Sequence, residues 1–211
     1  MRWSWITAIL NSILPRHPRA EKAVAISPKA LSPLFSPHTV KDHSWIHALF
    51  PYRDERVRSL IQAVKYYGER GVVDTLAPYA ADYITELIAH KKQMGGWGQV
   101  TLAPIPSSPA RVRERGYAQA VLLARAVGAR VPDATYDESL LTREDRTSQV
   151  HVSRAARRQN MVGAFTAHHR AHGMHVILID DVVESGATLE DARRALLDEG
   201  AKDVIAVALA H

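Results

Sequence analysis

The residues with the clearest chemical purpose follow a short apolar run near the C-terminal end of the chain. Residues 176–179, Val-Ile-Leu-Ile, predict a buried strand, and Asp180 and Asp181 come directly after it. Carboxylate oxygens accept hydrogen bonds, so these two acids suit the vicinal hydroxyls of a ribose, or a magnesium ion. Because the two acids repel phosphate, the phosphate group of a ligand would need to bind other residues of the site.

A loop of mostly small residues follows the two acids and opens a predicted helix. Its residues are Glu184, Ser185, Gly186, Ala187 and Thr188. Free N–H groups and the helix dipole favour an anion at such a helix start, and the hydroxyls of Ser185 and Thr188 can donate to phosphate oxygens. Gly186 lets the backbone approach a ligand closely. Strand, acid pair, loop and helix together predict a site for a phosphorylated sugar; the alternative is an ordinary strand–helix turn whose acids cap the helix.

The run from Val176 to Thr188 resembles the 5-phosphoribosyl-1-pyrophosphate (PRPP) loop of the type I phosphoribosyltransferases. The resemblance implies that the acid pair contacts the ribose hydroxyls, that residues 185–188 bind the 5-phosphate, and that PRPP binds with Mg²⁺. Glu184 departs from the small residue or Thr usual in that family. The hypoxanthine-guanine branch has an acid there, proposed as a base, so Glu184 is the candidate catalytic residue. The sequence leaves open whether Glu184 assists proton transfer or repels phosphate.

Two further segments are rich in arginine. The first follows a predicted strand at 100–106 and carries Arg111, Arg113 and Arg115 at alternate positions. Such a cluster could neutralise a pyrophosphate, or it could be a solvated basic loop. The second, residues 143–160, is rich in hydrogen-bond donors and could fold over an anionic substrate, or it could be an exposed hairpin. The candidates for pyrophosphate are Arg113, Arg115 and Arg146.

The order of these segments looks like the ComF family of competence-associated, phosphoribosyltransferase-like proteins. The motifs are Arg-Gly-Tyr-x-Gln at 115–119, Arg-Thr-x-Gln at 146–149 and Arg-x-x-Asn-x-x-Gly-Ala-Phe at 157–165. The resemblance covers most of residues 51–210, including Lys65-Tyr66 and Gly68. It implies an α/β fold of the type I phosphoribosyltransferase class, with residues 143–160 as a mobile hood, and a role with the DNA-import ATPase and recombination factors.

The chain also departs from ComF relatives in two ways. Many of them begin with a cysteine-based zinc module, whereas this chain has no cysteine, so no zinc is expected. Ala118 stands where relatives often have Asn. The lack of cysteine also excludes disulfides and fits a reducing cytoplasm, the location we expect.

The elements that must position these residues alternate along the chain. Helical periodicity predicts helices at 54–68, 74–91, 116–129 and 187–199, with a further strand at 203–210. Strands separated by helices imply a mostly parallel sheet with helices on both faces. We expect a phosphoribosyltransferase-like domain at 51–211, preceded by a helical and irregular segment at 1–50.

The segment 1–50 carries several open questions. The pattern of Met1–Leu14 favours a short amphipathic helix over a signal peptide. Residues 15–50 are rich in Pro, Ser and His and read as mostly irregular. The spacing of His38, His43 and His47 could gather two metal ligands, but scattered histidines are more often surface residues, and no protein-held metal is expected. No stretch of the chain approaches the ~20 apolar residues of a membrane span.

Two functions fit the sequence. The first is a phosphoribosyltransferase, a glycosyltransferase that transfers pentosyl groups, whose acceptor base or amine no motif identifies. The second is a non-catalytic adaptor in DNA import and recombination, which binds PRPP or a nucleotide and contacts protein partners or single-stranded DNA. The net charge of +5 and the basic residues of 111–158 suit a nucleic-acid strand. However, Tyr117 and Tyr136 are the only aromatic side chains within the Arg-rich stretch, which are few for a surface that stacks bases.

Overall fold

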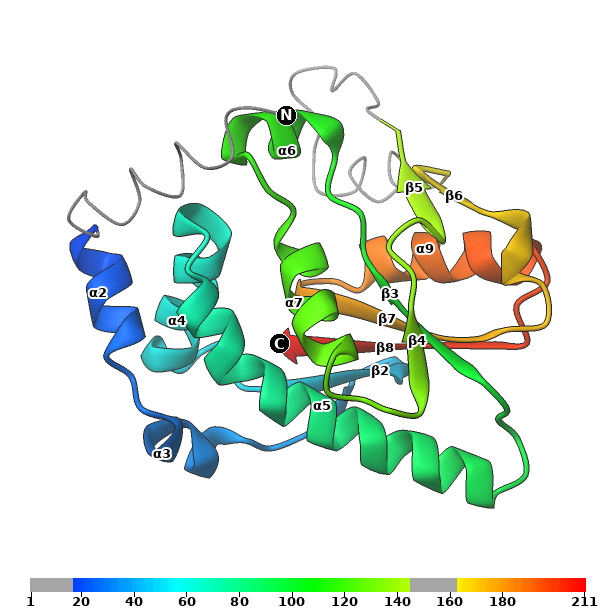
Figure 1. The fold of residues 1–211 in the computed structure, drawn as a ribbon, viewed down its shortest axis with the longest axis horizontal. Helices are drawn as coiled ribbons and strands as arrows, with labels where there is room; N and C mark the ends of the chain where they lie inside the picture. Colours follow the sequence, from blue (N-terminus) through cyan, green and yellow to red (C-terminus); the bar gives the residue numbers. More distant parts are fainter. Residues whose placement is uncertain (1–16, 145–162) are drawn as a thin grey trace.

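The computed structural model describes residues 17–144 and 163–211, and its centre is a six-stranded sheet (Figure 1). The strand order is β1-β2-β8-β7-β3-β4, and every pairing in it is parallel except that of β1 with β2. The strands are β1 (His38–Val40), β2 (His43–Phe50), β3 (Val100–Pro104), β4 (Ala134–Tyr136), β7 (His175–Val182) and β8 (Asp203–Ala210).

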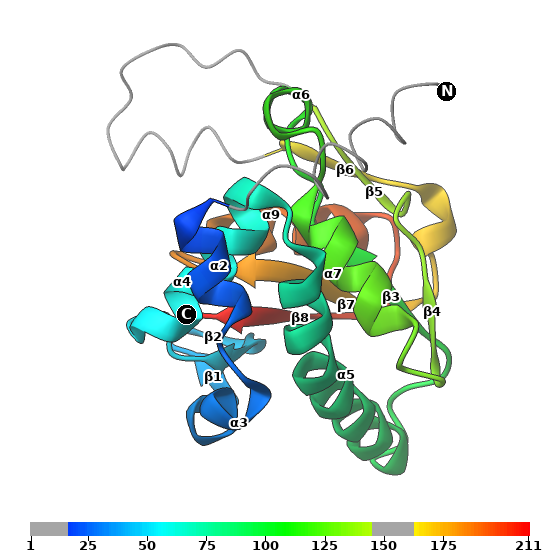
Figure 2. The same ribbon diagram turned by 60° about the vertical axis from the view of Figure 1, so that its left-hand side comes forward.

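Helices cover both faces of this sheet, as the alternation of predicted elements implied. The helices are α2 (Pro18–Val24), α3 (Pro28–Leu31), α4 (Glu55–Tyr67), α5 (Arg70–Gln93), α6 (Pro109–Arg115), α7 (Gln119–Gly128) and α9 (Ala187–Asp198), with 3₁₀ turns η1 (Ser32–Leu34) and η2 (His169–Ala171). Figures 1 and 2 show α5 and α7 together on one side of the sheet. The expected mostly parallel α/β sheet with helices on both faces is confirmed.

The central strands are apolar on both faces because each face is buried under helices. In β7, Ile177 and Ile179 pack with α4, α5 and α7, whereas Val176 and Leu178 pack with α9. Strands β7 and β3 run parallel with Ile179 opposite Pro104, and the amide of Ile105 donates to the carbonyl of Ile179 at 2.9 Å. The carboxyl ends of these two strands therefore meet at one edge of the sheet.

Two helix starts differ from those predicted from the sequence. Helix α5 begins at Arg70, four residues before the predicted start, so Pro78 lies inside the helix and not in its first turn. The interior proline removes one backbone donor, a cost that the buried side chains of this 24-residue helix offset. The helix predicted at 116–129 begins three residues later, at Gln119 of α7, because Gly116, with φ 79°, ends the short preceding helix α6.

The mostly irregular structure expected for residues 15–50 is wrong: α2, α3 and η1 occupy much of 18–34, and residues 38–50 are also regular. These residues form a hairpin, turning at Asp42 with φ 65°, and β2 pairs with β8 with Ile46 opposite Ala206. The apolar run at the end of β2 was masked in the sequence by the histidines beside it. The division of the chain at residue 50 stays a prediction, and the expected helix at Met1–Leu14 lies outside the described residues.

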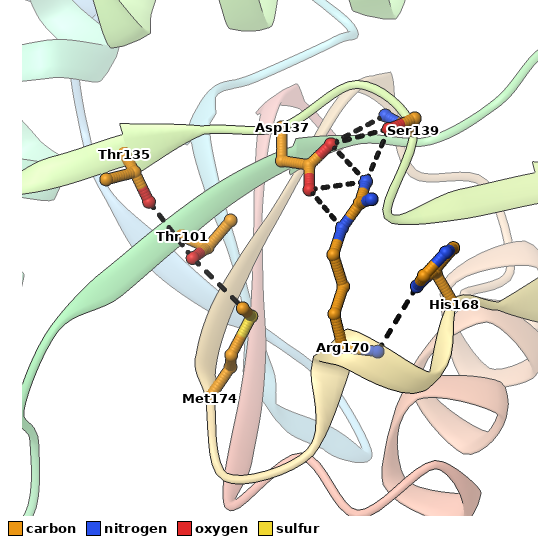
Figure 3. Close-up of polar contacts among 7 residues, drawn as sticks. All are labelled: Thr101, Thr135, Asp137, Ser139, His168, Arg170 and Met174. Carbon is orange, nitrogen blue, oxygen red and sulfur yellow. Dashed lines mark hydrogen bonds and ion pairs between the residues drawn. The ribbon is translucent and has the colours of Figure 1, made fainter.

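A separate two-stranded ribbon, β5 (Leu141–Arg143) paired with β6 (Phe165–Ala167), stands beside the main sheet (Figure 2). Figure 3 shows the polar contacts at its base. Arg170 of η2 donates from Nε to Asp137 Oδ2 at 2.8 Å and from Nη2 to Asp137 Oδ1 at 2.9 Å, and also to Ser139 Oγ. This charge-assisted fork links the chain before β5 to the chain after β6, so the two strands are held in register.

No helix in the described ranges combines the length and the hydrophobicity that crossing a bilayer requires.

Candidate functional site

A cavity of about 220 Å³ lies where the carboxyl ends of β3 and β7 meet. The parallel pairing of the two strands brings together the residues after β3 and the residues after β7, which are far apart in the chain. Six residues of the predicted site line this cavity: Asp180, Asp181, Glu184, Ser185, Gly186 and Thr188. Ligands of open parallel sheets bind at this edge, so the topology agrees with the chemistry of the residues.

The two acids differ in their surroundings. Asp181 is buried; its Oδ1 accepts from the Val182 amide at 2.8 Å, and its Oδ2 accepts no hydrogen bond within the described part of the chain. Asp180 is half-buried and its Oδ1 accepts from the Asp181 amide at 2.8 Å. Burial raises the pKa of Asp180 to about 8, and the negative charge of Asp181 acts in the same direction. Burial and mutual repulsion therefore disfavour a full negative charge on both members of the pair.

The loop after the acids is built for an anion. Gly186 is the N-cap residue of α9, has φ 75° and provides no side-chain cap, so the first amides of the helix receive no side-chain acceptor from it. Glu184 and Ser185 are exposed, and Thr188 is half-buried in the first turn next to Ala187. These amides and hydroxyls can bind a phosphate at the positive end of α9.

Gly186 is also required by a neighbour that the sequence did not indicate. A Cβ atom at this position would lie 2.9 Å from Nε2 of His43, which comes from β2. Nδ1 of His43 lies 3.4 Å from Oε1 of Glu190 on α9. Of the three histidines considered as metal ligands, His43 therefore packs behind the loop, while His47 bonds to Tyr83 and His38 to the Ser36 carbonyl.

Two of the three predicted pyrophosphate arginines, Arg113 and Arg115, are not part of the cavity lining. Arg113 is exposed, and Arg115 donates from Nη1 to Gln119 Oε1 at 3.2 Å. Arg146 lies outside the described residues. We expected a loop here, but these residues form helix α6, in which positions two apart are rotated by about 200°, so Arg111 and Arg113 point in different directions.

Three other cations line the cavity instead: Lys65 from α4, Arg111 from α6 and Arg143 from β5. Arg111 and Arg143 belong to the segments that the sequence singled out, but neither was chosen as a candidate. Lys65 lies far from every other site residue in the chain. In the sequence, Lys65 was noted only as part of the Lys65-Tyr66 motif that contributed to the ComF resemblance.

Arg143 is held by a chain of contacts that leads back to α9. Its guanidinium lies 5.2 Å from the ring centre of Phe165. The buried carboxylate of Asp191 on α9 accepts from the amides of Gly163 at 2.7 Å, Ala164 at 2.8 Å and Phe165 at 3.3 Å. Burial acts to raise the pKa of Asp191, but these amides and the contact with Arg194 outweigh it and lower the pKa. The helix that starts at the phosphate loop therefore also anchors the ribbon that carries Arg143.

Comparison with known proteins places this architecture in a family. A sequence model of the phosphoribosyl transferase domain matches residues 77–211. The competence protein ComFC of Bacillus subtilis (strain 168) is 28% identical over 153 residues, which cover 72% of this chain and 58% of ComFC. The DNA utilization protein YhgH of Salmonella typhi is 31% identical over 104 residues, 49% of this chain and 45% of YhgH. The chain thus spans about half the length of the curated relatives that it matches.

Solved structures with a similar arrangement include hypoxanthine phosphoribosyl transferase of Trypanosoma cruzi, with a TM-score of 0.41 and 13% identity over 65% of this chain and 63% of that one. The hypoxanthine-guanine phosphoribosyl transferase of L. donovani has a TM-score of 0.40 and 15% identity over 66% of this chain and 71% of that one. The family assignment rests on the sequence model, which spans more than half of the chain. The chain belongs to the phosphoribosyl transferase domain family, and it is a ComF-type phosphoribosyltransferase-like protein.

Proposed function

We propose that this protein binds PRPP with Mg²⁺ in the cavity at the ends of β3 and β7 and transfers its phosphoribosyl group to a nucleophile. The observation that carries the proposal is the coexistence in one cavity of the acid pair and the uncapped start of α9. An acid pair suits sugar hydroxyls and a helix start suits phosphate, and a 5-phosphorylated ribose has both groups.

Each part of the substrate has partners in this arrangement. Asp180 and Asp181 would accept hydrogen bonds from the ribose hydroxyls. Residues 185–188 would bind the 5-phosphate through amides and the hydroxyls of Ser185 and Thr188. The pyrophosphate would lie against Arg111 and Arg143, which line the cavity; Arg113, Arg115 and Arg146 remain candidates for contacts at its rim.

In the transfer step, the bond between C1 of the ribose and the pyrophosphate oxygen breaks, and pyrophosphate leaves with the electron pair. The nucleophile forms its bond to C1 and gives up a proton. The chain's own groups would contribute by holding the ribose and by stabilising the charge on the departing pyrophosphate. Glu184 is exposed at the cavity wall and is the candidate acceptor of the proton of the nucleophile.

Magnesium fits this site as a companion of the substrate. Within residues 17–144 and 163–211, no group of three or more His, Cys, Asp or Glu side chains is gathered to hold an ion. Mg²⁺ typically uses substrate phosphates and few protein carboxylates. We therefore propose that the oxygens of PRPP hold most of its coordination shell, and that the ion neutralises the pyrophosphate.

A second function is favoured by one surface feature. Tyr66 is 60% exposed, and the Arg115 guanidinium lies 5.4 Å from its ring centre; Arg111 and Arg113 are exposed on the neighbouring α6. An exposed aromatic ring beside several arginines can stack an unpaired base. Tyr66 supplies an aromatic surface that we did not expect near the arginines. A non-catalytic adaptor that contacts single-stranded DNA or competence and recombination proteins is therefore the alternative, in line with the names of the relatives.

Isothermal titration calorimetry with PRPP and Mg²⁺ tests the proposal. We expect saturable binding that Asp181→Asn weakens by at least about tenfold, because a charge-assisted hydrogen bond contributes ~1.5–3 kcal/mol. Asp198→Asn, which removes an exposed carboxylate at the other end of α9, is the matched control. Absence of PRPP binding by the natural protein would favour the adaptor.

We propose that the protein acts in the cytoplasm, because a multiply charged phosphosugar does not cross a bilayer unaided.

A further inference from the structure

We propose that Lys65 is a positioning residue for ribose recognition, which holds the Asp181 carboxylate in place so that a ribose hydroxyl can donate to it. The proposal rests on the proposed function of the cavity. It assigns part of the site to helix α4, which lies outside residues 77–211 matched by the family model.

Lys65 forms an ion pair with one member of the acid pair, Asp181. Its Nζ lies 3.4 Å from Oδ2 of Asp181, and the two side chains are 23% and 11% exposed. This is an ion-pair distance, yet Oδ2 accepts no hydrogen bond among the described residues. Oδ2 is itself buried, so the ammonium group fixes the carboxylate through Oδ2, and the lone pair that a ligand donor could use is on Oδ1, which also accepts from the Val182 amide.

The backbone that carries Lys65 is fixed. Lys65 lies in the last turn of α4, which ends at Gly68 with φ 63°. A Cβ atom at Gly68 would lie 3.0 Å from the ring of Tyr117, so the helix end packs directly against the turn that leads into α7. The neighbouring Val64 is buried in the core. Lys65 thus projects from a rigid position toward the cavity.

The charges around the pair explain why a cation is needed there. The charged side chains that line the cavity are Lys65, Arg111, Arg143, Asp180, Asp181 and Glu184. Two adjacent carboxylates repel each other, and a buried one is costly unless it is paired. Among the described residues, Lys65 makes the ion pair with Asp181, while Asp180 and Asp181 bond to backbone amides. Removing Lys65 would leave the buried Asp181 carboxylate without its cationic partner, so its side chain could rotate away from the position that a ribose hydroxyl requires.

A double-mutant cycle with ribose 5-phosphate as the probe tests this coupling. Ribose 5-phosphate has the hydroxyls and the 5-phosphate but no pyrophosphate, so it isolates the contacts that involve the acid pair. We expect Lys65→Met and Asp181→Asn each to weaken its binding by about tenfold, and the double variant to bind no more weakly than Asp181→Asn alone. Inorganic pyrophosphate should bind the Lys65→Met variant as it binds the natural protein.

Lys92→Met is the matched control, because Lys92 forms an exposed ion pair with Asp133, 3.0 Å between Nζ and Oδ2, away from this cavity. It should leave ribose 5-phosphate binding unchanged. Thermal unfolding reports whether each variant is folded, and Lys65→Gln replaces Lys65→Met if the latter is not.

The outcomes separate the inference from the proposed function. If the natural protein binds neither PRPP nor ribose 5-phosphate, the proposed function fails, and the role of Lys65 fails with it. If the natural protein binds ribose 5-phosphate and the two substitutions multiply in the double variant, Lys65 acts independently of Asp181 and the inference is wrong. A loss of affinity confined to pyrophosphate or PRPP would likewise overturn it, since Lys65 would then contact the leaving group.

Discussion

The two walls of the cavity are assembled in different ways. The wall formed by residues 180–188 is one uninterrupted segment, in which a strand end, a turn and a helix start follow each other. The cationic part of the lining, here called the dispersed wall, combines Lys65, Arg111 and Arg143, which come from α4, α6 and β5. A contiguous wall has its geometry encoded by local sequence, whereas a dispersed wall depends on how distant elements pack.

The largest effect expected on the contiguous wall comes from Gly186→Ala. The new methyl group would meet the His43 ring at 2.9 Å, in a backbone with φ 75° that alanine rarely adopts. We expect PRPP binding to fall below detection in calorimetry, and the free energy of unfolding to fall by about 1–3 kcal/mol. Gly95→Ala is the control, since Gly95 has the same φ of 75° with no atom within 4 Å of an added Cβ. Equal PRPP affinity in Gly186→Ala and the natural protein would show that the loop does not bind the phosphate.

The dispersed wall is tested by two arginines of the same short helix. Arg111→Ala should weaken PRPP binding by about tenfold, because Arg111 lines the cavity and a charge-assisted contact contributes ~1.5–3 kcal/mol. Arg113→Ala removes the same charge two residues away and should change the affinity by less than about twofold. Measurements at two salt concentrations separate the direct contact from the general field, which salt screens. A larger loss for Arg113→Ala would restore the assignment made from the sequence alone.

A further prediction for the contiguous wall concerns the stability of the acid pair in the absence of ligand. Because the pKa of Asp180 in the folded protein is raised to about 8 from its ordinary value of 3.8, the folded state retains a proton that the unfolded state has lost between these values. Stability should therefore fall as the pH rises from about 4 to about 8, and Asp180→Asn should remove this part of the pH dependence. Thermal unfolding at pH 6 and at pH 8.5 measures it, with a gain in Tm for Asp180→Asn that is larger at pH 8.5. A gain that is equal at both pH values would show that Asp180 is ionised throughout this range.

The difference between the contiguous and the dispersed wall also explains which site residues could be predicted from the sequence. The strand, acids and loop at 176–188 were identified because hydrophobicity, turn chemistry and helix start all occur within a short window. The cations were not, because the alternating arginines were assigned to a loop and form a helix, and because nothing in the spacing of Lys65 links it to Asp181. Arg146 and the rest of the proposed hood, residues 145–160, lie outside the described residues and stay predictions.

The fold, like the site, could be predicted where the sequence signals are local. The parallel sheet was predicted from the alternation of apolar strands and amphipathic helices, which are local signals. The hairpin at residues 38–50 was missed because its register with β8 is a long-range pairing, and three histidines dilute its apolar pattern. His43, which packs behind the phosphate loop, was missed for the same reason.

The pairing of β2 with β8 has a practical consequence for anyone who trims this chain. A fragment beginning at Pro51 would keep the predicted phosphoribosyltransferase-like domain but leave one side of β8 without its hydrogen-bonded neighbour. Strand β8 would then be an exposed, apolar edge strand, and such strands pair with other chains and cause aggregation. Expression trials should therefore retain the hairpin, or they will report on aggregation and not on substrate binding.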